Sequence, residues 1–170
     1  MWDRLLRNAR VVDPVNGRDG VMDVAVKDGR IAAVGPNLQG EASEVEDLTG
    51  LVVMPGLINL HTHAAMNLLR GRGADLPLMD WLTKEIWPAE GRLMSAEFVH
   101  DGSLIAGVEM IRSGVTCCSD LYFFPEAAAE GLREAGLRCA TAGIVIGFPS
   151  AWAANDDEYI SKCEALIERY

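Results

Sequence analysis

The chain has 170 residues, of which 49% are hydrophobic and 24% are charged, a composition typical of a folded globular protein. Its formal net charge of -10 argues against nucleic-acid binding, which draws on clustered Lys and Arg. The sequence contains no apolar run of the roughly 18–20 residues that a membrane span needs and no leader-like start, so we expect a cytoplasmic protein whose partner is a small molecule rather than a nucleic acid or a membrane.

The first third of the chain has the pattern of a small β-domain. Apolar and polar residues alternate loosely over residues 5–12 and 21–26, with turn-forming residues between them. The pair Asp28-Gly29 favours a type I′ hairpin turn, because glycine tolerates the positive φ that this turn requires. A further polar strand is expected over residues 44–48. We therefore expect short antiparallel strands over residues 1–52.

An apolar run then ends in two histidines, His61 and His63. The pair Pro55-Gly56 interrupts any earlier strand, and the run that follows is typical of a parallel-sheet strand covered on both faces. Side chains alternate along a strand, so the two imidazoles lie on the same side and can share one metal ion. Zinc binds such nitrogens, and the carboxyl end of a strand is where barrel enzymes hold their active sites.

The next segment predicts a loop followed by a short helix. The loop over residues 64–76 carries Arg70 and Asp75, which we expect to fix it through a salt bridge rather than touch substrate. Apolar residues at every fourth position predict a helix over residues 78–86, and Pro88 is expected to close it.

A longer helix is predicted from the N-cap Ser95 to Ser113, with Gly114 ending it. It carries His100, the remaining histidine. No Cys or carboxylate pattern accompanies His100, so we expect it to be solvated on the surface rather than to bind metal.

Strands and helices continue to alternate, which predicts parallel α/β folding with right-handed crossovers. Asp120 and Tyr122 stand at the carboxyl end of a strand and so face the site region, but the sequence assigns them no role. The expected strands and helices cover residues 115–121, 125–135 and 137–147 and a last helix from residue 156.

Several joined segments carry a family resemblance. Residues 54–63 (MPGLINLHTH) resemble the first barrel strand of the amidohydrolase superfamily. Three later segments narrow the resemblance further, namely residues 64–71, 75–82 (DLPLMDWL) and 86–90 (IWPAE). They resemble the branch that holds methylthioadenosine/S-adenosylhomocysteine deaminases and triazine chlorohydrolases.

The resemblance implies an α/β fold with a partial (β/α)8 TIM barrel. The first three βα units would occupy residues 53–170, preceded by residues 1–52 as the N-terminal part of a composite β-sandwich. A complete barrel takes about 250 residues. We therefore expect the chain to stop partway around the barrel, as the N-terminal portion of a longer protein.

The resemblance also implies site residues. His61 and His63 would hold one divalent metal, zinc in the first place and iron as the alternative. Two further histidines, an aspartate and the acid/base carboxylates would come from later strands, so we assign no catalytic residue within the chain. Glu90 would bind ribose hydroxyls, because a carboxylate accepts both donors of a cis-diol. Trp81 would line the nucleoside pocket with its flat ring.

The implied activity is hydrolytic deamination of 5′-methylthioadenosine or S-adenosylhomocysteine, in which metal-activated water attacks the ring and ammonia leaves. One alternative is an s-triazine or guanine-type hydrolase on the same scaffold, because one barrel hosts many reactions. The other is a truncated, non-catalytic fragment. Two histidines hold an ion poorly, so the 170-residue chain alone is expected to be inactive. The sequence leaves a homo-oligomer open.

Overall fold

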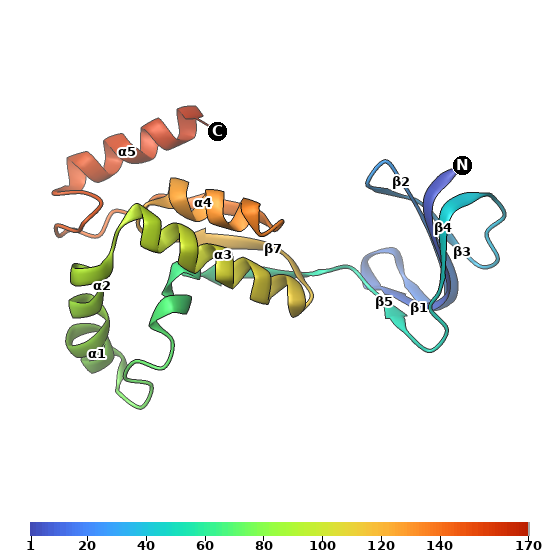
Figure 1. The fold of residues 1–170 in the computed structure, drawn as a ribbon, viewed down its shortest axis with the longest axis horizontal. Coiled ribbons are helices and arrows are strands. Elements are labelled where there is room, and N and C mark those ends of the chain that lie inside the picture. Colours follow the sequence, from blue (N-terminus) through green and yellow to red (C-terminus); the bar gives the residue numbers. More distant parts are fainter. Residues whose placement is uncertain (170) are drawn as a thin grey trace. The chain divides into compact units, whose positions relative to one another are not determined.

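The computed structural model describes residues 1–169 and divides into two compact units, Met1–Pro55 and a second that begins at Gly56 (Figure 1). The first unit consists mainly of strands, and the second contains both strands and helices, so the chain is of mixed α/β type. None of the helices in the described range is long and apolar enough to cross a bilayer.

The first unit is a sheet of five strands with the order β3-β2-β1-β4, in which the short β5 also pairs with β1. Neighbours β1, β2 and β3 are antiparallel, as predicted, whereas β4 and β5 run parallel to β1. A single 3-10 turn, η1 (Pro14–Asn16), joins the first two strands. The strands are β1 (Trp2–Asp13), β2 (Arg18–Lys27), β3 (Arg30–Gly35), β4 (Ala42–Asp47) and β5 (Val52–Val53).

Two local features shape this sheet. Asp28 and Gly29 have φ angles of 51° and 69°, the left-handed conformation that a type I′ turn requires, so the predicted hairpin is confirmed. The ladder between β1 and β2 is irregular at Asn8, whose φ is 60°. The buried carboxylate of Asp23 accepts hydrogen bonds from the backbone N–H groups of Asn8 and Leu38, at 3.0 Å each, and so stabilises the irregularity.

The second unit contains a parallel sheet, as the alternation of elements predicts. Its strands β6 (Leu57–Thr62), β7 (Val115–Leu121) and β8 (Arg138–Ala142) lie in the order β6-β7-β8. The crossover helices α3 (Ala96–Arg112) and α4 (Pro125–Glu134) lie side by side against β7 (Figure 1). A last helix, α5 (Asp156–Arg169), follows β8.

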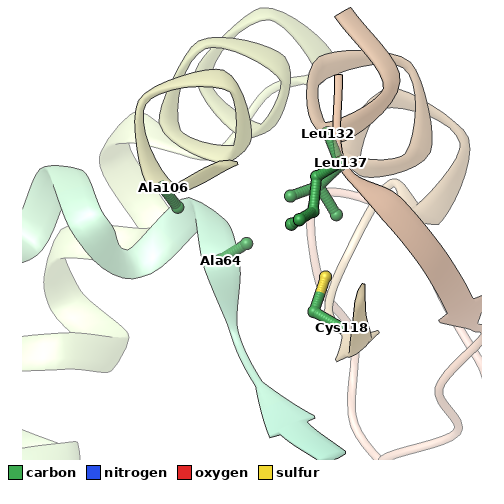
Figure 2. Close-up of a cluster of buried hydrophobic side chains, with 5 residues drawn as sticks. All are labelled: Ala64, Ala106, Cys118, Leu132 and Leu137. Atoms are coloured by element: carbon green, nitrogen blue, oxygen red, sulfur yellow. The ribbon is translucent and has the colours of Figure 1, made fainter. Parts of the chain in front are cut away.

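A buried cluster joins these helices to the sheet (Figure 2). Figure 2 shows Leu132 of α4 and Leu137 next to each other, with Cys118 of β7 directed toward them. Ala106 of α3 and Ala64 complete the cluster. Ala64 begins the 3-10 segment η2 (Ala64–Leu69), so the core also fixes the chain directly after His63.

Strand β6 differs from its prediction. It pairs only with β7 in the part of the chain that the structure describes, and so lies at the edge of the sheet. The side chains of Leu57, Ile58 and Leu60 are 52%, 63% and 79% exposed. The expectation that both faces of this strand are covered is therefore wrong for residues 1–169, because no neighbouring strand or helix in that range lies over these side chains.

The helix around Pro88 also differs from its prediction. Three segments follow one another without a break, namely α1 (Leu78–Trp81), the π-helical η3 (Leu82–Ile86) and α2 (Trp87–Leu93). The N–H of Trp87 donates to the carbonyl of Leu82, five residues earlier. This wider turn puts Pro88 in the first turn of α2, where a missing N–H costs little, so Pro88 does not close the helix.

The start of α3 agrees with its prediction, and small residues make up most of its buried face. The Ser95 hydroxyl accepts from the N–H of Phe98 at 3.1 Å, which confirms the N-cap. The buried positions of this helix are mostly small residues, Gly102, Ser103, Ala106 and Gly107, whereas Val108 and Ile111 are exposed. Small side chains let α3 approach both η2 and α4 closely.

This close packing predicts a cost for adding one methyl group. A Cβ at Gly131 of α4 would overlap the backbone carbonyl of His100 and lie 3.0 Å from the backbone nitrogen of Leu104. We expect Gly131→Ala to lower the free energy of unfolding by about 1–3 kcal/mol, because backbone atoms cannot yield as a side chain does. Urea unfolding of the intact protein measures this. Gly91→Ala is the control, since a Cβ there meets nothing within 4 Å; an equal loss in both variants would contradict the explanation.

Candidate active site

The end of strand β6 holds the imidazole rings of His61 and His63 close together. The strand ends at Thr62, and His63 follows it directly. The ring centroids of His61 and His63 lie 5.0 Å apart, with the ring planes at 78°. The structure thus brings together the two histidines that the sequence singled out.

The backbone of β7 orients one of these rings. Nδ1 of His63 lies 2.5 Å from the carbonyl oxygen of Leu121. A carbonyl only accepts, so Nδ1 carries the proton and Nε2 keeps its lone pair for a metal ion. Such a carbonyl contact is the usual support for a metal-binding histidine.

The donor set fits zinc but is incomplete. Imidazole nitrogen is a preferred zinc ligand, and catalytic zinc usually has three protein ligands and an open position. Among residues 1–169, no group of three or more His, Cys, Asp or Glu side chains is placed to hold an ion. Within the described residues, His61 and His63 therefore lie close together without a third metal-binding side chain placed beside them.

Asp120 lies at the carboxyl end of β7, in electrostatic reach of His63. Its side chain is 1% exposed, and Oδ1 accepts from the N–H of Ala64 at 2.7 Å. Its other oxygen has no hydrogen-bond partner among the described residues. Burial raises the pKa of Asp120, while the hydrogen bond from Ala64 and the charge of His63 oppose that rise. This residue joins β7 to the turn that follows His63.

A tyrosine connects Glu90 with the histidines. The Tyr122 hydroxyl donates to Oε1 of Glu90 at 2.5 Å, and the Tyr122 ring centroid lies 6.0 Å from that of His63. Burial raises the pKa of Glu90, while the Tyr122 hydrogen bond and the charge of His63 lower it. Burial and the neighbouring Glu90 raise the pKa of Tyr122, so its hydroxyl remains a donor. Sequence reasoning missed this pairing; the position of Tyr122 at a strand end was the available signal.

Glu90 also lines a hollow of about 310 Å³. Trp87 and Phe148 form one wall, with ring centroids 5.8 Å apart and planes at 61°. Met94 and Phe123 also line it. These residues come from α2 and from segments after β7 and β8, so sequence reasoning, which considered one motif at a time, missed the hollow. A larger hollow of about 830 Å³ between α4, β8 and α5 contains none of the predicted site residues.

Trp81 lies apart from this hollow. Its indole N–H donates to the carbonyl of Arg72 at 2.7 Å, and its ring packs on the cluster of Leu69, Ile86 and Ala89. Arg70 fixes the same loop, but it bonds to Asn67 and Glu109 rather than to Asp75, so the predicted partner is wrong.

His100 lies at the surface, as the sequence suggested, with two carboxylates beside its ring. Its Nδ1 lies 3.0 Å from Asp101 and its Nε2 lies 3.3 Å from Glu134 of α4. The hydrogen bond to Asp101 is the main cause that raises the pKa of His100. The contact with Glu134 could not be read from the sequence, because it forms only through the packing of two helices. His100 links those helices and does not join His61 and His63.

Comparisons with known proteins agree with this geometry. The model of the amidohydrolase family matches residues 52–170. A 5-methylthioadenosine/S-adenosylhomocysteine deaminase of Aquifex aeolicus is 43% identical over 169 residues, which are 99% of this chain and 38% of that protein. An adenosine deaminase structure from Xanthomonas campestris with bound zinc has a TM-score of 0.93 at 37% identity, and covers 99% of this chain and 40% of that chain.

A more distant structure shares the fold alone. The zinc complex of atrazine chlorohydrolase from Arthrobacter aurescens TC1 has a TM-score of 0.83 at 21% identity, over 98% of this chain and 43% of that chain. The chain thus spans about two fifths of the length of the proteins it matches. The resemblance drawn from residues 54–90 is confirmed.

Proposed function

The chain belongs to the amidohydrolase family, and from this premise we propose that it is the N-terminal part of a metal-dependent deaminase acting on an adenine nucleoside. The favoured substrates are 5′-methylthioadenosine and S-adenosylhomocysteine. Water would add to the ring carbon that carries the amino group, and ammonia would leave as the C–N bond breaks. The observation that supports this proposal best is Glu90, held by Tyr122 beside the two histidines.

We propose that residues 53–170 form the first three βα units of a TIM barrel. Residues 1–52 would be the N-terminal part of a composite β-sandwich. The parallel order β6-β7-β8, with α3 and α4 as crossovers, supports the first assignment. The exposed side chains of β6 would then face parts of the protein that follow residue 170.

His61 and His63 would be two ligands of a zinc ion. When bound, the ion would supply Lewis acidity and lower the pKa of a water molecule. The contact of Nδ1 with the Leu121 carbonyl orients the His63 ring and leaves Nε2 available as the atom that would bind the ion. Zinc in the solved relative from Xanthomonas campestris supports this choice of metal.

Glu90 would bind the ribose. Its Oε1 accepts from Tyr122, which fixes the carboxylate, and Oε2 can accept a sugar hydroxyl. Trp81 would contribute its ring to the nucleoside pocket rather than a hydrogen bond, because its N–H already serves Arg72. The general acid and base would come from residues beyond this chain.

The test is ammonia release by the protein at its full encoded length, loaded with zinc. We expect release from 5′-methylthioadenosine and none from adenine, which lacks the sugar that Glu90 would hold. Residues 1–170 alone should release none, because the chain provides only two of the ligands. Turnover of s-triazines or guanine without nucleoside turnover would instead favour the alternative that the atrazine chlorohydrolase fold suggests.

A further inference from the structure

We propose that the hollow beside Glu90 receives the substituent on the 5′ carbon of the nucleoside, and that it selects a small apolar group over a charged one. This inference rests on the proposed function. It assigns Trp87 and Phe148 as specificity-determining residues, which neither the family match nor the sequence motifs identify.

The contacts from His63 through Tyr122 and Glu90 to the hollow indicate how a nucleoside would lie in the site. The Tyr122 ring lies next to His63, its hydroxyl bonds to Glu90, and Glu90 in turn lines the hollow. A nucleoside with its ring amino group at the histidines and its sugar hydroxyls at Glu90 would extend its far end past Glu90. The hollow is the space that lies there.

The chemistry of the hollow favours an apolar occupant. Trp87, Phe123 and Phe148 provide aromatic surface, and Met94 and Pro149 add apolar atoms. Thioether sulfur makes favourable contacts with aromatic rings. Both wall residues remain accessible, because Trp87 is 40% and Phe148 is 45% exposed. A methylthio group could therefore be buried against them.

The charge of the hollow disfavours an amino-acid tail. Glu90 is the only charged side chain that lines it among the described residues, and no Lys or Arg does so. The carboxylate of a homocysteine tail would lose water against this aromatic lining, and it would lie near Glu90, a carboxylate of the same sign. S-adenosylhomocysteine would thus bind less well than 5′-methylthioadenosine.

The wall is held in place before any substrate binds. The Tyr159 hydroxyl, on α5, lies 3.2 Å from the carbonyl oxygen of Phe148 and 2.6 Å from Oγ of Ser150. Ser150 in turn accepts from the N–H of Trp152 at 3.0 Å. Because Tyr159 is fully buried, these contacts fix the segment that carries Phe148.

The experiment compares kcat/KM for 5′-methylthioadenosine, 5′-deoxyadenosine, adenosine and S-adenosylhomocysteine, using the zinc-loaded protein at its full encoded length. We expect 5′-methylthioadenosine to exceed S-adenosylhomocysteine at least about tenfold. Trp87→Ala should raise KM for 5′-methylthioadenosine about tenfold and change adenosine much less. Leu93→Ala, at an exposed position of the same helix, is the control and should change neither.

A second variant tests charge directly. Phe148→Arg places a cation at the exposed wall, and we expect it to shift the preference toward S-adenosylhomocysteine. Equal turnover of both thioethers by the unchanged protein, or an equal loss for all substrates in Trp87→Ala, would overturn the inference while leaving the deaminase function intact. No turnover of any nucleoside would overturn the proposed function, and the inference with it.

Discussion

His63→Ala is expected to remove zinc and to lower deamination by about a thousandfold or more. The variant loses the imidazole that the Leu121 carbonyl orients, and with it the several kcal/mol that a bound ion contributes to the transition state. His61→Ala should behave in the same way, because its ring lies beside that of His63. The measurements are zinc content by atomic absorption and ammonia release, both on the protein at its full encoded length.

His100→Gln is the matched control for this prediction. It also removes a histidine, but one that lies between Asp101 and Glu134 on the helices. Its zinc content and activity should match those of the unchanged protein. If His61→Ala and His63→Ala both kept full zinc, the metal centre would have to lie elsewhere.

Glu90→Gln is expected to lower kcat/KM for nucleosides about a hundredfold, because a charged acceptor for the sugar hydroxyls is replaced by a neutral amide. Glu97→Gln, on the exposed first turn of α3, is the control and should have no effect. A comparable loss in both variants would show that general charge, rather than ribose binding, is responsible.

The raised pKa of Glu90 predicts that nucleoside binding depends on pH. Burial raises the pKa of Glu90, so its carboxylate takes up a proton at a higher pH than an ordinary glutamate, for which the pKa is about 4.3. Nucleoside binding should therefore weaken as the pH falls through this raised pKa and recover above it. Glu90→Gln should lack this acid limb; if the limb persisted in the variant, another group would cause it.

The sequence predicted those features that depend on neighbouring residues. The hairpin at Asp28-Gly29, the N-cap at Ser95 and the strand over residues 115–121 each follow from local preferences, and each is present. The pair His61 and His63 was predictable because strand geometry alone puts alternate residues on one side.

Features that depend on distant contacts were missed. The helix continues past Pro88 because a π-turn forms ahead of it, and apolar spacing does not reveal such a turn. Tyr122 meets Glu90 across 32 positions of sequence, and the hollow beside them combines three segments. The exposure of β6 was also unpredictable, since an apolar strand has the same pattern at the centre of a sheet and at its edge.

The support of His63 by a main-chain carbonyl makes the ring insensitive to the side chain at that position. Every residue type offers the same oxygen, so the side chain at position 121 can vary without disturbing the imidazole, and the Leu121 side chain is 38% exposed. What must be inherited is the alignment of two strands, in which Thr62 stands opposite Asp120. If β6 and β7 shifted by one residue relative to each other, the Leu121 carbonyl would no longer lie opposite the His63 ring. The support of His63 therefore depends on the packing that keeps β7 in place, such as that of Cys118 in the buried cluster, rather than on the side chain at position 121.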